Sequence, residues 1–397
     1  MDDFVTDQVT DLQLDRSDWQ LVKFGDVAIQ QKESVDRENT DVTRYVKGEH
    51  MGSEDLHLRE WGELTDEYLG PAFIRKFEQG DILYGSRRTY LRKVAVAHFD
   101  GITSNTTFVI KANETRIDKR LLPYVMLSEG FAEHSIRNSK GSVNPYINWK
   151  DIADYEFLLP PKDQQTQLAE LLWSLDAVLE QSLFLLKNNE IYIESLVENN
   201  LTSTRVKGIL NDYCFSDGIR IGPFGSLLHA SDYQSEGVPV VMPADIVDGV
   251  INEKGIARIS NKKAEELANY RLKENDILFP RRGDLTKRAI VLNHQENWIC
   301  GTGTIRVRVN ENVNSKTVFY AVTSKSTNNW LCGSSVGTTM QNINASTIKK
   351  IPFHLPKGAE AQKTLRDIES AINASVCIKN HISSSENLKK SLINQIF

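Results

Sequence analysis

Two long stretches of the chain place apolar residues at three- and four-residue steps. In the first stretch these residues are Leu168, Leu171, Leu172, Leu175, Val178, Leu179, Leu183 and Leu186. In the second, which has a serine-rich middle, they are Leu365, Ile368, Ile372, Val376, Ile382, Leu388, Leu392 and Ile396. Such spacing is typical of a helix that buries one stripe along most of its length. We expect two helices of about 40 residues, each about 60 Å long, that pack on each other as a coiled coil.

Each helical stretch follows a segment whose apolar runs are short and rich in β-branched residues. Residues 93–97 and 288–292 are examples, and the charged or turn-forming residues around them complete the pattern of β-strands. Proline marks the boundary to the helix at Pro160-Pro161 and again at Pro356. The pattern predicts an α+β chain with two globular domains and two helical segments. These domains and segments are expected, in turn, at residues 1–160, 161–202, 203–357 and 358–397.

The two halves carry the same short motifs in the same order. One motif occurs as Asp81-Ile82-Leu83-Tyr84 and, 195 residues later, as Asp276-Ile277-Leu278-Phe279. Basic pairs occur as Arg87-Arg88 with Arg92-Lys93 and, at shifts of 194 and 195, as Arg281-Arg282 with Lys287-Arg288. At a shift of 196, Gly141-Ser142-(x4)-Ile147-Asn148-(x3)-Ile152 matches Gly337-Thr338-(x4)-Ile343-Asn344-(x3)-Ile348, and Leu159-Pro160 matches Leu355-Pro356. Four landmarks that drift by two residues indicate a tandem duplication.

Composition narrows the class of protein. Hydrophobic residues make up 40% of the chain and charged residues 25%, which is typical of a globular protein, and no apolar run approaches the roughly 20 residues of a membrane span. The N-terminus lacks the features of a secretory signal, so we expect a cytoplasmic protein. The four cysteines lie far apart without C-x-x-C spacing, so neither a zinc ribbon nor a disulfide framework is expected.

The net charge of −6 hides an uneven distribution. Residues 1–70 carry 7 basic and 18 acidic side chains, whereas residues 203–357 carry 20 basic and 14 acidic ones. Long-range attraction to phosphate depends on this local field rather than on the total. An acidic chain can therefore still present a basic face to nucleic acid.

The duplicated motifs resemble those of the specificity subunits of Type I restriction-modification systems, over essentially the whole chain. The motifs that carry the resemblance are Gly80-Asp81-Ile82-Leu83 with Asn275-Asp276-Ile277-Leu278, the Gly-Ser/Thr-(x4)-Ile element, Leu159-Pro160-Pro161 with Gln164-Gln165, and Ile221-Gly222-Pro223-Phe224-Gly225-Ser226. Two departures exist. The second helix start, at residues 355–362, is degenerate, and the first domain lacks the Gly-Pro-Phe-Gly motif. These differences imply that the two domains read different sequences.

The resemblance implies a non-catalytic, sequence-specific DNA-binding subunit. It implies two target-recognition domains related by approximate two-fold symmetry through an antiparallel pair of helices, which acts as a spacer between the halves of a bipartite site in double-stranded DNA. Methyltransferase subunits would dock on this scaffold, and restriction and translocase subunits would join them for cleavage. S-adenosylmethionine, ATP and Mg²⁺ would bind to those partners, and this chain would carry no cofactor.

The apolar stripes of both helices are wider than a two-stranded seam uses, which suggests a docking face for partner helices. We assign this face to Leu168, Leu172, Leu175, Leu179, Ile368, Ile372, Leu388 and Leu392.

The candidate DNA contacts are side chains that can neutralise phosphates or read base edges. The basic candidates are Arg87, Arg88, Arg92, Lys93, Arg281, Arg282, Lys287 and Arg288. The polar and glycine-loop candidates are Ser142, Asn144, Tyr146, Gly225, Ser226, Thr338, Gln341 and Asn342. The alternative is a solvated turn whose side chains cap their own backbone. Duplication favours DNA contact for the basic set, whereas both interpretations of the polar set remain open.

Catalytic motifs are incomplete. Asn144-Pro145-Tyr146 lacks one proline of the adenine-methyltransferase signature, and residues 222–226 lack the lysine of a P-loop. None of the eight histidines forms a metal-ligand motif. The alternatives to a DNA-reading subunit are a methyltransferase or nuclease with unfamiliar motifs and a coiled-coil adaptor without DNA affinity.

Overall fold

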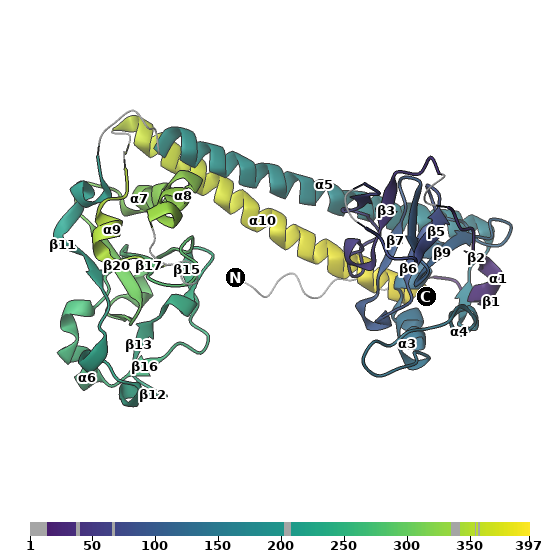
Figure 1. Ribbon diagram of the computed structural model, residues 1–397, viewed down its shortest axis with the longest axis horizontal. Coiled ribbons are helices and arrows are strands. Elements are labelled where there is room, and N and C mark those ends of the chain that lie inside the picture. The colour runs from purple at the N-terminus through teal and green to yellow at the C-terminus, as the bar shows by residue number, and fades with distance from the viewer. Residues whose placement is uncertain are drawn as a thin grey trace. The chain divides into compact units, whose positions relative to one another are not determined.

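The computed structural model describes residues 14–36, 40–65, 68–201, 208–334, 342–353, 355 and 358–397, apart from the side chain of residue 226. The chain forms two compact units (Figure 1). Unit 1 comprises residues 1–183 and 380–397, and unit 2 comprises residues 184–379. Each unit contains one α+β domain together with one part of each long helix.

Unit 1 is built on two four-stranded sheets and one strand pair. The first sheet has the antiparallel order β2 (Ala28–Gln31), β9 (Thr107–Ala112), β6 (Ile82–Gly85) and β7 (Val94–Val96). The second has the order β4 (Gly62–Glu63), β3 (Arg44–Val46), β8 (Gly101–Ser104) and β5 (Phe73–Phe77), with β3 and β8 parallel. The additional pair is β1 (Gln20–Lys23) with β10 (Glu156–Leu159).

Short helices cover the first sheet of unit 1 and complete its core. They are α1 (Phe24–Val27), α2 (Leu122–Leu127), α3 (Glu129–Arg137) and α4 (Trp149–Ala153), with 3-10 turns at Gly48–His50 and Thr89–Leu91. The main core cluster joins buried residues of these elements to Leu168 and Leu172 from the first long helix and Leu392 and Ile396 from the second. The long helices are thus part of the core of the domain.

Unit 2 repeats this plan. Its first sheet has the antiparallel order β11 (Cys214–Ile221), β20 (Thr304–Val309), β17 (Ile277–Pro280) and β18 (Ala289–Ile290). Its second has the order β12 (Tyr233–Gln234), β16 (Arg258–Ile259), β13 (Val238–Val241) and β19 (Ile299–Cys300), with β13 and β19 parallel. A further pair is β14 (Ile246–Val247) with β15 (Val250–Ile251). The helices are α6 (Asn261–Glu266), α7 (Ser315–Val322), α8 (Lys325–Ser334) and α9 (Ala345–Lys349), and the 3-10 turns are Leu210–Tyr213, Gly225–Leu227, Ala230–Asp232, Pro243–Asp245, Ala268–Tyr270 and Asn293–Gln295.

The matching sheets confirm the tandem duplication, and the repeated aspartate has a structural reason. Asp81 accepts a hydrogen bond from the backbone N–H of Glu78, and Asp276 accepts one from Lys273, both at 2.8 Å. The preceding residue is left-handed in both copies, with φ of 91° at Gly80 and 67° at Asn275. Glycine and asparagine are the residues that adopt this conformation most readily. The motif therefore forms the tight turn that starts the central strand.

The repeated Ile-Asn-(x3)-Ile motif starts a short helix in both units. The first isoleucine is buried, the asparagine is the N-cap, and the last isoleucine is fully buried under the helix. In α9 the side chain of Asn344 accepts the backbone N–H of Thr347 at 2.9 Å, which is a standard helix cap.

The two long helices are α5 (Lys162–Leu201) and α10 (Ala359–Ile396). In unit 1, Asp176 of α5 contacts Lys389 of α10. In unit 2, Asn189 of α5 donates to the backbone carbonyl of Ala371 of α10 at 2.6 Å. Residues later in α5 therefore contact residues earlier in α10, which confirms that the two helices are antiparallel.

The Gln-Gln motif fastens the start of α5 to its domain. Gln165 is buried, donates to the carbonyls of Pro160 and Arg116 at 2.8 and 3.1 Å, and accepts the N–H of Asp118 at 2.7 Å. At the start of α10, Gln362 is exposed. The start of α10, where the Gln-Gln motif is degenerate, is therefore attached to its domain in a different way.

The repeated aspartates provide a stability test, because their ion pairs differ. Asp276 is buried and its two oxygens accept Nε and Nη2 of Arg308 at 2.7 and 2.6 Å. Among the described residues, the ion pair of Asp81 is the one with Lys111, at 3.7 Å. Asp276→Asn keeps the backbone hydrogen bond but removes the counter-ion, and we expect it to lower the free energy of unfolding by about 3 kcal/mol. Urea unfolding of the full chain should show a clearly smaller loss for the control Asp81→Asn, and equal losses would contradict this account.

Candidate nucleic-acid interface

The loop after the central strand is joined to the segment before the short helix in the same way in both units. In unit 1, Arg87 bridges to Tyr146, and the N–H of Ile147 donates to the carbonyl of Ser86 at 2.9 Å. In unit 2, Arg282 bridges to Asn342, and the N–H of Ile343 donates to the carbonyl of Arg281 at 3.0 Å. These bonds hold two candidate segments side by side.

The backbone bonds correct one alignment of the repeat. The sequence pairs Arg87 with Arg281 at a shift of 194, but the structure pairs Arg87 with Arg282 at a shift of 195 and places Ser86 opposite Arg281. The strands explain the difference, because β6 and β17 begin 195 residues apart and continue without a gap. Only one arginine of the first basic pair is therefore common to both units.

In unit 1 the loop opens onto a groove of about 360 Å³. Its polar lining comes from four separate segments and comprises Gln30, Lys32, Ser86, Arg87, Asn105, Thr106, Tyr146 and Asn148, beside Trp149. The amide oxygen of Gln30 is buried and has no hydrogen-bond partner among the described residues. Leaving a buried acceptor unpaired costs free energy, which a donor from a ligand would recover.

Unit 2 has unpartnered polar atoms at the matching place. Within the described part of the chain, Nε of Arg281 and the amide oxygen of Asn342 are buried without a hydrogen-bond partner. Arg282 is exposed beside them. Guanidinium and amide groups are those that pair with base edges and phosphates. Both units thus offer unsatisfied hydrogen-bonding groups beside the joined segments.

The loop beside the groove in unit 1 holds further candidates. Arg88 has a left-handed backbone, with φ of 53°, and its N–H donates to the carbonyl of Pro145 at 2.6 Å. Its Nε donates to the side chain of Asn144 at 3.3 Å. Ser142, Asn144 and Tyr146 are exposed. Their position leaves them available to a ligand.

Arg92 does not fit a DNA contact. Its side chain is only 14% exposed and forms ion pairs with Glu54 at 2.7 Å and Glu129 at 2.8 Å. It also donates to the carbonyl of Leu127 at 2.5 Å. The neighbouring Lys93 is half-buried and donates to the carbonyl of Gly48 at 2.5 Å. These ion pairs neutralise the charge of Arg92 within the domain and favour a structural role over the predicted DNA contact.

Arg288 also has structural contacts, which argue against the DNA contact predicted for it. It is 2% exposed, its guanidinium lies 4.2 Å from the ring centre of Phe279, and it donates to the carbonyl of Leu285 at 2.5 Å. Burial lowers its pKa to about 9. Lys287 beside it remains exposed. The repeat of Arg92-Lys93 as Lys287-Arg288 thus reflects packing at least as much as binding.

The glycine loop at residues 222–226 has a packing role as well. A Cβ on Gly222 would lie 1.9 Å from the carbonyl oxygen of Gly301, so this position admits only glycine. Gly225 has φ of 64°, and Phe224 is exposed. The predicted contacts Thr338 and Gln341 and the side chain of Ser226 lie outside the described residues.

The apolar residues predicted to form the partner-docking face are largely covered within the chain. Leu168, Leu172, Leu179, Ile368 and Leu392 are buried. Leu175, Leu388 and Ile372 are half-buried and pack against the same core clusters. A partner would have to contact other residues of the helices.

Comparison with known proteins identifies the family. Residues 16–189 and 225–385 match the family described as "Type I restriction modification DNA specificity domain". The chain belongs to this family. Over 164 residues it is 26% identical to the Type I restriction enzyme EcoDI specificity subunit of Escherichia coli. That match covers 41% of this chain and 35% of the length of that relative.

Two solved structures share the fold. One is the Type I restriction-modification system S subunit from M. genitalium, with 14% identity, a TM-score of 0.55 and 98% of each chain covered. The other comes from a study described as "Structural basis underlying complex assembly and conformational transition of the type I R-M system". It has 15% identity and a TM-score of 0.62, and the match covers 95% of this chain and 97% of that chain. In the described residues, no helix is long and apolar enough to span a membrane, and no group of three or more histidine, cysteine or acidic side chains could hold a metal ion.

The junction of the two candidate segments gives a direct test in unit 2. Arg282→Ala removes the exposed guanidinium that both units share, and we expect it to weaken DNA binding by about 1–3 kcal/mol, or roughly 5- to 150-fold, if it pairs with a base. Arg366→Ala on α10 removes the same charge from an exposed site on a different element of unit 2. Titration of the target duplex by fluorescence anisotropy should separate the two variants. A loss of the same size in both would remove Arg282 from the interface.

Proposed function

We propose that this chain is the specificity subunit of a Type I restriction-modification complex and reads a bipartite site in double-stranded DNA. Residues 1–160 and 203–357 act as target-recognition domains, and residues 161–202 and 358–397 as the spacer between them. The observation that carries the proposal is the duplicated backbone junction of the two candidate segments, beside which both units present an exposed arginine and buried polar atoms without a hydrogen-bond partner among the described residues. Side chains around that position differ between the units, as reading of two different half-sites requires.

The subunit acts without a catalytic centre of its own. Methyltransferase subunits modify the site, and restriction and translocase subunits cleave DNA, so S-adenosylmethionine, ATP and Mg²⁺ bind to these partners. Membership of the DNA specificity family supports this division of labour. It disfavours a stand-alone methyltransferase or nuclease and a coiled-coil adaptor without DNA affinity. A methylation assay on the isolated chain and a mobility-shift assay with genomic fragments test those two alternatives.

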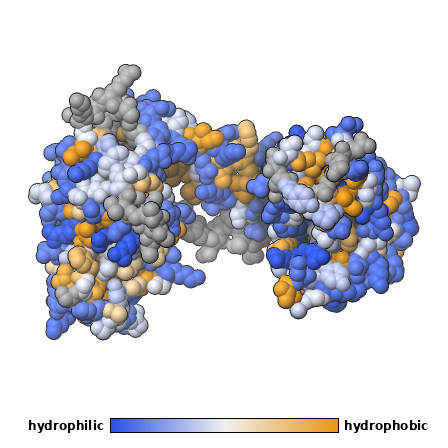
Figure 2. Space-filling model, in the orientation of Figure 1, coloured by the Kyte–Doolittle hydropathy of each residue, from blue (hydrophilic) through white to orange (hydrophobic). Residues whose placement is uncertain are grey.

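The methyltransferase subunits dock on the exposed face of α5. The apolar side chains of this helix that are between 41% and 66% exposed are Leu171, Val178, Phe184, Leu185, Ile191 and Tyr192. Four of them follow one another at intervals of seven residues, which places successive residues on one face of a helix. Figure 2 shows apolar residues gathered on the surface of the helical segment. Exposed apolar patches of this kind mark interaction sites.

Charge on this face should block assembly. We expect the double variant Leu185→Asp and Tyr192→Asp to lose capture of the methyltransferase subunit in a pull-down, because a partner helix would have to desolvate two carboxylates. Lys187→Asp introduces an acidic group on the same helix but on the side opposite the row formed by Leu171, Val178, Leu185 and Tyr192, and should retain capture. Normal capture by the double variant would place the docking face elsewhere.

The spacer role predicts a change in the recognised sequence. Four residues inserted after Ser182 in α5, with four at the matching level near His381 in α10, lengthen both helices by about 6 Å. This corresponds to about two base pairs at about 3.4 Å each, with a rotation of roughly 40°. Mapping of methylated sites with the complete partner set should show unchanged half-sites and a longer gap. An unchanged gap with full activity would show that partner subunits, rather than these helices, set the spacing.

A further inference from the structure

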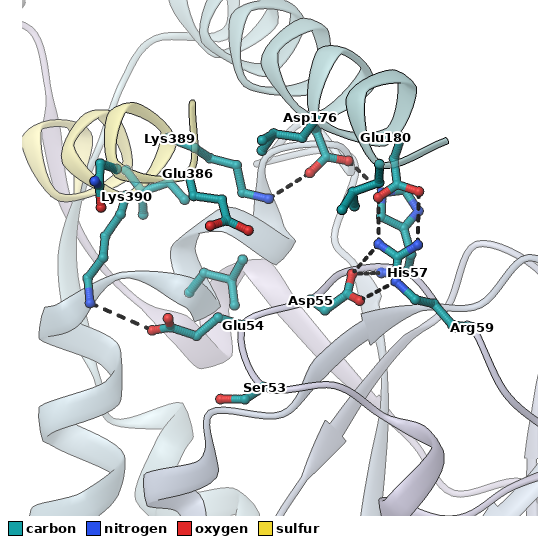
Figure 3. A pocket seen from close by; sticks show the side chains of 15 residues that line it. Ser53, Glu54, Asp55, His57, Arg59, Asp176, Glu180, Glu386, Lys389 and Lys390 are labelled. Atoms are coloured by element: carbon teal, nitrogen blue, oxygen red, sulfur yellow. Dashed lines mark hydrogen bonds and ion pairs between the residues drawn. The ribbon is translucent and has the colours of Figure 1, made fainter. Parts of the chain in front are cut away.

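In unit 1, a loop of the domain lies against both long helices and encloses a pocket of about 570 Å³ (Figure 3). The loop contributes residues 53–59, and the helices contribute residues 176–183 and 386–393. Leucine and isoleucine side chains form part of its wall, and charged side chains converge across it (Figure 3). This pocket is where the domain meets the helix pair away from the apolar core.

Asp176 stands at the junction of the three elements. It lies on α5, is 3% exposed, and accepts Nε2 of His57 from the loop and Nζ of Lys389 from α10, both at 2.7 Å. Burial alone would raise the pKa of Asp176, but the hydrogen bond from His57 and the charge of Lys389 hold it below its ordinary value. One carboxylate thus connects the loop to both helices (Figure 3).

Two further sets of ion pairs flank this junction. Arg59 of the loop donates to both oxygens of Glu180 on α5, at 2.5 and 3.1 Å, and to Asp55 at 2.7 Å. On the other side, Lys390 of α10 contacts Glu129 at 2.9 Å. Hydrogen bonds are directional, whereas apolar contacts are not. The network therefore fixes the angle between domain and helices more tightly than core packing alone.

Unit 2 attaches its domain differently. In the part of unit 2 that the structure describes, the ion pairs from the domain to the helices are Lys325 with Glu194 at 2.6 Å and Lys316 with Glu369 at 2.8 Å. Their side chains are partly or largely exposed. Among the described residues of the two long helices, Asp176 is the buried ionisable side chain. The directional attachment by a buried charge is thus a property of unit 1.

We propose that Asp176 is a positioning residue, which holds the first recognition domain at a fixed angle on the helix pair and so restricts the gap between half-sites that the complex accepts. The inference rests on the proposed function. Replacing Asp176 leaves Lys389 and His57 without their shared acceptor, and the loop loses its central tie to the helices. The groove lies on other elements, so reading of the half-site itself is unaffected.

The contact between the loop and the helices at Asp176, called the tie below, depends on pH because one of its partners is His57. The hydrogen bond to Asp176 raises the pKa of His57, with Glu180 of α5 and Asp55 of the loop adding to the effect and burial opposing it. Arg59, Lys389 and Lys390 are the other cations of the network. A raised pKa in the folded state means that the stabilisation is fully present at low pH and is lost as pH rises through that pKa. The tie is therefore strongest below the raised pKa of His57.

The test uses the full chain assembled with its methyltransferase partner, on duplexes with natural half-sites and gaps altered by one or two base pairs. We expect Asp176→Asn to reduce the preference for the natural gap about tenfold while sequence preference within each half-site stays unchanged. His57→Gln, at the half-exposed end of the network, should reduce it less and remove the fall in preference with rising pH that the unmodified chain shows. The matched control is Glu194→Gln, which breaks the exposed ion pair in unit 2 and should leave the gap preference unchanged.

Hydrogen exchange on the free chain tests the tie without DNA. Amides of residues 53–59 should exchange at least tenfold faster in Asp176→Asn than in the unmodified chain. Unchanged gap preference in both Asp176→Asn and His57→Gln, or unchanged exchange in the loop, overturns the inference. If the unmodified assembly methylates no bipartite site, the proposed function fails instead, and hydrogen exchange still decides whether Asp176 ties the loop to the helices.

Discussion

Burial of the apolar stripes on α5 and α10 is the constraint on which the rest of the structure depends. The continuous apolar stripe of a 40-residue helix must be buried, and one antiparallel partner helix buries only part of that stripe. The domains cover more, since Leu168 and Leu172 lie in the core of unit 1, and Val197 and Ile368 lie in that of unit 2. Burying a leucine side chain contributes about 1.5–3 kcal/mol. Domain and helix are therefore joined by the same contacts that stabilise each of them.

The fold could be predicted from the sequence because its signals are periodic or repeated. Apolar spacing predicts the helices, and the tandem motifs predict two copies of one domain. The motifs proved to be folding signals: Asp81 and Asp276 close turns, and Asn344 caps a helix. A comparison of the two halves detects the residues that both copies of the domain require in order to fold.

The same logic explains why the site was only partly predicted. A repeat comparison favours structural residues, and it therefore selected Arg92 and Arg288, whose charges are used inside the domains. Gln30 and Asn105, which line the groove of unit 1, have no repeated signal and lie on separate elements that only the fold brings together. Residues that distinguish two half-sites must differ between the copies. Ser86 opposite Arg281 and Tyr146 opposite Asn342 are such differences, and no motif shared by the halves could reveal them.

The connectivity of the two units has a consequence for biosynthesis. Unit 2 is one continuous segment, residues 184–379, whereas unit 1 needs residues 380–397 to complete it. Leu392, Ile393 and Ile396 fill the core of unit 1 beside residues from its first half. Domains usually fold in the order in which the ribosome makes them. Here unit 1 cannot complete its core until residues 380–397 have been synthesised, so unit 2 can reach its native state before unit 1 does.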